Sequence, residues 1–430
     1  MSINGPRIAL VGAGGASFGP VMAYETVCAE GLAGATLVLV DINAPRLETA
    51  AAAARRMNES RGNPVNIETE TDTARGVAAA DYVLLSVEAG RWKYWKQDLE
   101  IPRGHGSLQD MGENGGPGGT FHALRTISLV LKICKLIEEN APHATLINVT
   151  NPLSRVCLAV HRATKINCIG LCPELMLCKL RLARCLFIPP EKIVVRAAGL
   201  NHFTWIFGLA TEFGGHDLYP RLGRHVKSFP WMHGRLVREY YRGTGLYPVS
   251  SDSHIGEYLP HTGPRSVLPQ WFPYQQFSET ECRMRVRLTE LYAAGKFDIP
   301  WKILPRNIEG GIDIIEALET GKTAHFEAVN VPNRGCIPGL PEDVYVEVPA
   351  RSENGKLLPE KMPPLPEPAA RFARLQARIH NLTVDAVLNR DPAPALEAFS
   401  IDPLAPPTAE KCRKAFNELV KLQKDVLPFS

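Results

Sequence analysis

The chain has 430 residues and a formal net charge of +3, from 48 Lys and Arg against 45 Asp and Glu. A single hydrophobic core stops growing near ~250–300 residues, so two packed domains are expected. The composition, 45% hydrophobic and 22% charged, is that of a globular protein and excludes large-scale disorder. The small net charge argues against a nucleic-acid-binding protein.

The N-terminal residues run directly into a strand pattern and lack the apolar core of a signal peptide. No run of ~18 apolar residues occurs, so a membrane span is not expected. The ten cysteines show no paired CxxC spacing and are interpreted as reduced thiols. We therefore expect a cytoplasmic protein that binds neither nucleic acid nor membrane.

Short apolar runs alternate with helical stretches through the first part of the chain. The strands show almost no polar alternation, which is typical of a parallel sheet covered on both faces. Residues 1–195 are therefore predicted to form a doubly wound, Rossmann-type α/β domain, and residues 196–430 an α+β substrate domain. We expect strands at 7–11, 35–41, 81–87, 144–150 and 167–171, helices near 20–30, 45–58, 126–140 and 410–424, and long loops around 215–275.

A glycine loop at residues 12–19 follows the first expected strand. Gly12 permits a tight turn, and Gly14 and Gly15 let the backbone approach a pyrophosphate at a helix N-terminus. Ser17 stands where the third glycine of the dinucleotide fingerprint is expected. Asp41 closes the second strand, where it can accept hydrogen bonds from a ribose diol and would repel a 2′-phosphate, so the pattern predicts NAD rather than NADP. The alternative is a tight turn that binds nothing.

Two further motifs follow strands of the predicted sheet. Asn151 lies at the carboxyl edge, where ligands bind, and its amide suits a sugar hydroxyl; an Asn-Pro turn that merely ends a strand is the alternative. Cys172 and His202 are candidate metal ligands, because a thiolate and an imidazole bind borderline divalent ions. A buried structural cysteine and histidine would be the commoner case.

Residues 252–258 contain four groups that can transfer protons: Asp252, His254, Glu257 and Tyr258. A polar loop is the alternative interpretation. A second glycine-rich stretch, residues 115–119, precedes His122 and Arg125. It indicates either a backbone that approaches a ligand closely or a mobile loop, and Arg125 can equally be a charge on a helix surface.

In their order and spacing, these motifs resemble the NAD-dependent family 4 glycoside hydrolases over nearly the whole chain. The resemblance implies a fold like that of lactate and malate dehydrogenases, with NAD and a divalent metal, usually manganese. It also implies cleavage of an α-glycoside by transient oxidation at C3, deprotonation at C2, elimination and addition of water. The likeness rests on the glycine loop with Asp41, on Cys172 and on several short segments. These segments are residues 118–119, 123–127, 150–152, 201–205, 245–248, 329–335 and 344–350.

The resemblance also implies roles for individual residues. Asp252 is the first candidate for the base at C2 and Tyr258 the second, and Cys172 and His202 are the metal ligands. The family commonly has His, Asp or Asn after the metal-binding cysteine, whereas this chain has Pro173 and then Glu174, which indicates a divergent branch. The expected substrate contacts are Asn151, Asn201, His122, Arg125 and His254, and the expected cofactor contacts are Gly12, Gly14, Gly15, Ser17, Phe18, Asp41, Arg46, Asn148 and Thr150.

The expected substrate is an anionic hexoside, either a sulfoquinovoside or a uronide, or a neutral hexoside. The cations considered for a C6 anion are His122, Arg125, His254 and Arg265. An NAD-dependent sugar or 2-hydroxy-acid dehydrogenase is the alternative enzyme, since fold does not fix function. A non-catalytic NAD-binding protein is the third possibility. The resemblance further implies a homo-oligomer.

Overall fold

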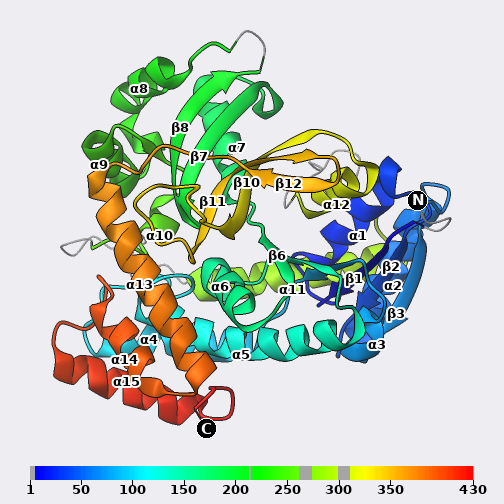
Figure 1. Cartoon of the computed structure of the whole chain (residues 1–430), viewed down its shortest axis with the longest axis horizontal. Coiled ribbons are helices and arrows are strands. Elements are labelled where there is room, and N and C mark those ends of the chain that lie inside the picture. Colours follow the sequence, from blue (N-terminus) through cyan, green and yellow to red (C-terminus); the bar gives the residue numbers. More distant parts are fainter. Residues whose placement is uncertain (1–4, 213–214, 261–273, 299–309, 430) are drawn as a thin grey trace.

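The computed structural model describes residues 5–212, 215–260, 274–298 and 310–429. Its first half carries a parallel sheet in the order β3-β2-β1-β4-β5-β6. This order confirms the predicted doubly wound, Rossmann-type fold. Strands β1, β2 and β3 lie together at the right of Figure 1. The strands are β1 (Arg7–Val11), β2 (Thr36–Val40), β3 (Asn66–Glu70), β4 (Tyr82–Leu85), β5 (Thr145–Asn148) and β6 (Asn167–Gly170).

Alternate residues of each central strand enter different hydrophobic cores. In β1, Ile8 and Leu10 belong to one core, whereas Ala9 and Val11 belong to the other. Both faces are therefore covered, which explains why the strands lack polar alternation. The helices and 3-10 turns of this half are α1 (Gly19–Cys28), η1 (Glu30–Leu32), α2 (Ala44–Glu59), α3 (Thr73–Val77), α4 (Arg91–Gly104), α5 (Gly116–Asn140), α6 (Leu153–Ala163), α7 (Glu174–Leu186) and η2 (Pro190–Lys192).

The sheet continues beyond β6 into an antiparallel part in the order β10-β11-β7-β8-β9, with β12 paired to β11. Gly170 of β6 pairs with Asn330 of β10, and Glu347 of β11 pairs with Gly199 of β7. One sheet thus runs through both predicted domains, and the boundary at residue 195 stays a prediction. The strands are β7 (Ile193–Leu200), β8 (Phe203–Thr211), β9 (Tyr247–Pro248), β10 (Ala324–Pro332), β11 (Tyr345–Glu353) and β12 (Lys356–Pro359).

Helices of the second half return to the first half of the chain. Helix α13 packs on α5 and α6, α14 on α5, and α15 on α4, at the lower left of Figure 1. The predicted C-terminal helix at 410–424 is confirmed as α15. The helical segments are α8 (Tyr219–Ser228), η3 (Pro230–Met232), α9 (Arg235–Thr244), α10 (Asp252–Ile255), α11 (Tyr274–Ala293), α12 (Gly311–Thr320), α13 (Glu367–Asn389), α14 (Pro392–Ile401) and α15 (Ala409–Gln423).

The expectation of long loops around 215–275 was wrong for the described residues there. Helices α8 and α9 form because Leu222 with Val226, and Leu236 with Val237, bury one side of each helix. Helix α5 also starts ten residues earlier than predicted, at Gly116. Within the described ranges, no helix combines the length and hydropathy needed to cross a membrane.

The glycine-rich stretch before His122 packs against protein rather than forming an open loop. A Cβ at Gly118 would lie 2.6 Å from the Asp98 carbonyl oxygen of α4, and one at Gly119 would lie 2.8 Å from the Asn114 carbonyl carbon. Glycine at these positions therefore lets α5 begin in close contact with α4 and with the preceding loop.

Arg125 joins three helices through a buried ion pair and is not the surface charge considered from the sequence. Its Nη1 and Nη2 lie 3.0 and 2.7 Å from the carboxylate oxygens of Asp98 in α4. Its Nη1 also donates to Gln423 of α15 at 2.7 Å. Arg125 is 2% exposed and Asp98 is fully buried, so the guanidinium is committed to this contact rather than to a substrate.

Loss of the Asp98 carboxylate should destabilise the protein strongly. In Asp98→Ala the buried guanidinium loses its partner, and we expect the free energy of unfolding to fall by about 3–5 kcal/mol. Urea unfolding followed by circular dichroism measures this loss. The matched control is Glu100→Ala, which breaks an exposed contact to Lys96 on the same helix and should cost less than about 1 kcal/mol. Equal losses in the two variants would contradict the structural role.

Candidate active site

The carboxyl ends of the parallel strands carry most of the candidate residues. The glycine loop follows β1, Asn151 lies beyond the end of β5, and Cys172 comes directly after β6. Because parallel strands end at the same edge of a sheet, these segments share one side of the molecule.

The glycine loop is a tight turn held by the neighbouring strands. Gly12 has φ of 91°, and a Cβ there would lie 1.9 Å from the Ser86 carbonyl oxygen, so only glycine fits. The Gly14 N–H donates to Oδ2 of Asp41 at 2.9 Å, and the Asn43 N–H donates to Oδ1 at 2.8 Å. Asp41 is therefore fixed directly beside the loop.

In the dinucleotide fingerprint, the third glycine lets the helix approach the strand closely. In this chain Gly19 has that role. This residue begins α1, and a Cβ there would lie 2.0 Å from the Ala13 carbonyl oxygen. Ser17 is exposed and Phe18 is the partly buried N-cap of α1. Arg46 is exposed in the first turn of α2. The sequence held this signal, because Gly19 lies two positions after Ser17, where the third glycine was expected.

Asn148 and Thr150 tie the ends of β4 and β5 together. The Thr150 hydroxyl accepts the Val87 N–H at 3.0 Å and donates to the Leu85 carbonyl at 3.2 Å. Asn148 is fully buried, and its side-chain oxygen accepts the Thr150 N–H at 3.1 Å. These two side chains bond within the protein and shape the edge on which Asn151, which is partly exposed, is presented.

The structure brings Cys172 and His202 together. The Sγ of Cys172 lies 3.2 Å from Nε2 of His202. His202 occupies the two-residue turn between β7 and β8 with φ of 63°, a region that costs a non-glycine residue of order 1–3 kcal/mol and is enriched at functional sites. The contact joins the end of the parallel sheet to the first turn of the antiparallel part.

A buried carboxylate holds this turn in place. Glu347 of β11 accepts hydrogen bonds from Asn201 at 3.0 Å, from Thr204 at 3.0 Å and from Asn330 at 3.1 Å. Asn201 is 4% exposed, so its amide supports the turn rather than standing open to a substrate. Burial raises the pKa of Glu347, and these donors oppose the rise.

Glu174 and His254 complete a cluster around His202. The Nδ1 atoms of His254 and His202 are 3.0 Å apart, and Glu174, His202 and His254 each place one ligand atom within 4.8 Å of the others. Pro173 is the N-cap of α7 and sets Glu174 at its buried first position. The carboxylate of Glu174, which follows the departure at Pro173, thus lies near His202, one of the two expected metal ligands.

The donor atoms of this cluster suit a borderline divalent ion. Burial, with His254 nearby, lowers the pKa of His202 well below its usual value, so the ring is neutral and able to ligate. A thiolate, an imidazole and a carboxylate are ligands that transition metals accept. His254 faces the nitrogen of His202 opposite to Cys172, where it can orient the ring.

The two candidates for the base lie in different surroundings. Both carboxylate oxygens of Asp252 accept backbone N–H groups of α9, from Leu236 at 3.1 Å and Val237 at 3.0 Å. Asp252 replaces the side-chain cap that Gly234 cannot supply. Tyr258 is buried, and its ring centroid lies 5.7 Å from that of Phe203, the residue that follows His202. Burial raises the pKa of its phenol well above the usual value.

Arg155 is a site residue that sequence reasoning missed. It is fully buried in α6, and its Nε and Nη2 have no hydrogen-bond partner in the part of the chain that the structure describes. Its charge lowers the pKa of the Tyr258 phenol against the effect of burial. The available signal was an arginine within the apolar run that follows Asn151 and Pro152.

His122 lies in a separate charged cluster. Its Nδ1 is 2.7 Å from the Glu113 carbonyl oxygen, and its Nε2 is 3.1 Å from a carboxylate oxygen of Glu88. Burial raises the pKa of Glu88, but His122 and Arg91 together hold it at about 2. His122 is therefore bonded within the protein at both nitrogens. Arg265, the last cation considered for a C6 anion, lies outside the described residues.

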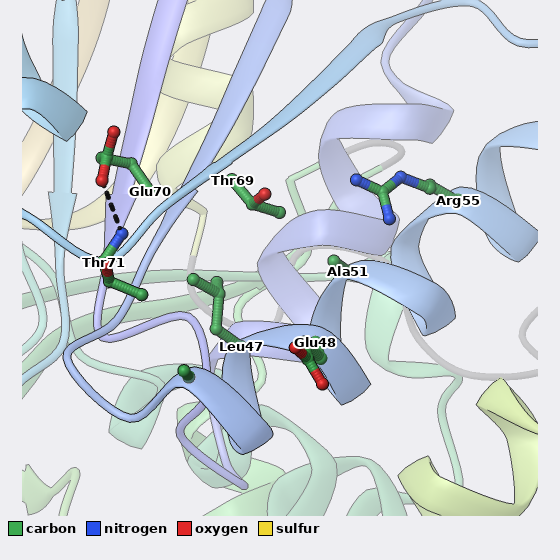
Figure 2. A pocket seen from close by; sticks show the side chains of 8 residues that line it. Leu47, Glu48, Ala51, Arg55, Thr69, Glu70 and Thr71 are labelled. Carbon is green, nitrogen blue, oxygen red and sulfur yellow. Dashed lines mark hydrogen bonds between the residues drawn. The ribbon is translucent and has the colours of Figure 1, made fainter.

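A pocket of about 290 Å³ opens between α2 and the edge strand β3 (Figure 2). The Glu70 carboxylate on its rim accepts the backbone N–H of Thr71 at 2.9 Å and that of Asp72 at 3.0 Å. This pocket is formed by the edge strand and α2, and it contains none of the candidate site residues. It is lined by Ala44, Leu47, Glu48, Ala51, Arg55, Thr69, Glu70 and Thr71.

Glu257 anchors the loop before α5 beside the candidate site. Its Oε1 accepts the N–H groups of Glu113 at 2.7 Å, Asn114 at 3.0 Å and Gly115 at 3.4 Å. Its Oε2 has no hydrogen-bond partner among the described residues. Burial raises the pKa of Glu257 to about 7, although His254 lowers it.

Glu257 should make stability depend on pH in a defined window. The native protein holds a proton on Glu257 more tightly than the unfolded chain, so stability should fall as pH rises from about 4.5 to about 7 and level off above. The Glu257 carboxyl should account for at most about 3 kcal/mol of this fall in the free energy of unfolding. Glu257→Gln should lose that part of the pH dependence. Urea unfolding at pH 5 and pH 7.5 measures it, with the exposed Glu100→Gln as control. An unchanged decline in Glu257→Gln would contradict the assignment.

The comparisons with known proteins cover almost the whole chain. An alpha-glucosidase of Erwinia rhapontici is 28% identical over 442 residues, covering 92% of this chain and 93% of the relative. An alpha-galactosidase of Bacillus subtilis (strain 168) is 31% identical over 404 residues, with the same two coverages. The crystal structure of a 6-phospho-alpha-glucosidase from gut microorganisms, in complex with NAD and Mn²⁺, superposes with a TM-score of 0.85 at 21% identity and covers 99% of both chains.

Two family models divide the chain between them. Residues 7–188 match the family 4 glycosyl hydrolase model, and residues 197–405 match the family 4 glycosyl hydrolase C-terminal domain. Both the resemblance drawn from the motifs and the predicted fold are confirmed. The chain belongs to the family 4 glycosyl hydrolases.

Proposed function

We propose that this protein is an NAD-dependent glycosidase that cleaves an α-hexoside with the help of a divalent metal. The observation that carries the proposal is the Cys172–His202 contact, on the same sheet edge as the glycine loop. β1 and β6 are separated by three strand spacings of about 4.8 Å, or roughly 14 Å, a span that an extended dinucleotide can bridge. A nicotinamide ring bound there would lie near the metal-ligand pair.

The chemical groups around the glycine loop suit a bound dinucleotide, as does the shape of the loop. The start of α1 at Gly19 leaves backbone N–H groups at the helix N-terminus for a pyrophosphate. The carboxylate of Asp41, placed beside Gly14, suits a ribose diol and disfavours NADP. When bound, NAD supplies the acceptor that oxidises the sugar at C3 and the donor that reduces it again, so the reaction has no net redox change.

Cys172 and His202 are proposed as the metal ligands, with Glu174 beside them as a carboxylate donor. A divalent ion held there would supply Lewis-acid stabilisation of the sugar oxygens at C2 and C3. The amide of Asn151, at the same edge, is proposed to bind a sugar hydroxyl.

Tyr258 is the better supported of the two bases. Asp252 already uses both carboxylate oxygens to cap α9, whereas Tyr258 packs against Phe203, the residue next to the ligand His202. Burial raises the pKa of the phenol, and the charge of Arg155 opposes this rise and so helps the phenol to lose its proton. The resulting phenolate can remove the C2 proton once the C3 ketone has made that proton acidic.

A neutral α-hexoside is the substrate that we expect first. His122 and Arg125, two of the cations considered for a C6 anion, are bonded within the protein, and His254 belongs to the cluster around His202. The similar alpha-glucosidase and alpha-galactosidase act on neutral hexosides by name. We further propose that the protein acts in the cytoplasm as a homo-oligomer.

A release assay on aryl α-glycosides tests the function. The panel contains a glucoside, a galactoside, a glucuronide, a sulfoquinovoside and a 6-phosphoglucoside, each with and without NAD and Mn²⁺. We expect release of the aglycone from a neutral hexoside that requires NAD and leaves absorbance at 340 nm unchanged. Accumulation of NADH on free sugars, without release, would identify a dehydrogenase. Binding of NAD without either activity would identify a non-catalytic NAD-binding protein.

Replacement of the two candidate bases separates their roles. Tyr258→Phe should lower kcat by about 10²–10⁴-fold while NAD affinity is retained, because the proton acceptor is lost. Asp252→Asn should chiefly lower thermal stability, because a helix cap is typically worth about 1 kcal/mol. Steady-state kinetics and melting curves measure both effects. A larger kcat loss in Asp252→Asn than in Tyr258→Phe would return the base to Asp252.

A further inference from the structure

We propose that Cys185, His225 and His233 form a second divalent-metal site, which prefers zinc or cobalt. The three residues come from different elements: the last turn of α7, the last turn of α8 and the residue that follows η3. One ligand atom of each lies within 4.8 Å of the other two. The chain therefore folds so that a thiol and two imidazoles converge on one point.

The spacing of the ligand atoms fits a tetrahedral ion. The Nδ1 of His225 and the Nε2 of His233 are 3.0 Å apart. Bonds of about 2.0–2.1 Å to nitrogen and 2.3 Å to sulfur place tetrahedral ligand atoms roughly 3.3–3.6 Å apart. The two nitrogens would therefore have to separate by about 0.3 Å to hold the ion between them.

His233 is already oriented as a ligand. Its Nδ1 lies 2.8 Å from the Tyr247 hydroxyl, which leaves Nε2 facing His225. An outer partner on the second ring nitrogen is the usual arrangement at metal-binding histidines. Burial, with His225 and Arg238, lowers the pKa of His233 to about 4, so the ring is neutral at physiological pH.

The chemistry of the donors sets the kind of metal. One thiolate and two imidazoles favour zinc or cobalt over manganese, which prefers oxygen ligands. Burial raises the pKa of the Cys185 thiol and Arg181 opposes this rise, so metal binding must release the thiol proton. Arg238 donates to the His233 carbonyl oxygen at 2.8 Å, and Arg181 lines the same pocket as Cys185 and His233.

This cluster is separate from the one around His202. Cys185 lies eleven residues after Glu174 on α7, or roughly 16 Å along the helix. Cys185 and His233 line a pocket of about 300 Å³ between α7 and α9, which also contains Asp252. A fourth coordination position would open toward this pocket and accept water.

Cobalt(II) titration of the full-length Cys172→Ser protein tests the proposal. This background removes the thiolate of the first site, so a thiolate-to-cobalt charge-transfer band can report only another cysteine. We expect one equivalent of cobalt with that band. The band should vanish in Cys172→Ser/Cys185→Ser and persist in Cys172→Ser/Cys178→Ser, where Cys178 is a buried thiol of the same helix outside the cluster.

Two further variants protect the test against a folding defect in Cys185→Ser. In the Cys172→Ser background, His225→Gln, at a half-buried position, should abolish the band, and Tyr247→Phe should weaken cobalt binding by about 10–100-fold. Circular dichroism verifies the fold of each variant. A folded Cys172→Ser protein without the band, or a band that survives both Cys185→Ser and His225→Gln, would overturn the second site. Neither result depends on glycosidase activity.

Discussion

The buried carboxylate of Glu347 is the interaction on which the site depends. It receives hydrogen bonds from the turn between β7 and β8, from β8 and from β10, while its own strand continues the sheet. Removing the carboxylate would leave several buried donors without a partner, each costing about 1–3 kcal/mol. Glu347 thereby holds His202 in its left-handed conformation, opposite the cysteine that ends the parallel sheet. The candidate site is thus assembled across the junction between two kinds of sheet.

Much of the first half could be predicted because its signals are local. Buried parallel strands are continuous apolar runs, and all five predicted strands occur in the structure within a few residues. The edge strand β3 was missed because its residues are largely exposed and polar, as in Asn66 and Glu68. Arg125 was also misjudged, because its partners Asp98 and Gln423 are distant in the sequence. The return of α13–α15 to the first half depends on the same long-range packing.

The candidate site was also predicted only in part from the sequence. The motif comparison paired Cys172 with His202 across thirty residues, and the structure brings them into contact. It did not reveal Glu174 as a neighbour of His202, because the turn of α7 after Pro173 decides where the carboxylate lies. Asp252 ranked above Tyr258 in the sequence because of its place after residues 245–248 in the family resemblance. Only the structure shows that its two oxygens cap α9.

We expect this protein to cleave a glycosidic bond through a sugar that is oxidised at C3 and deprotonated at C2. Hydrolysis in deuterated water, followed by mass spectrometry and NMR of the released sugar, tests it most directly. Deprotonation at C2 predicts a product that carries solvent deuterium at that carbon. A product that contains no deuterium at C2 after complete hydrolysis would contradict the account and indicate direct displacement at C1.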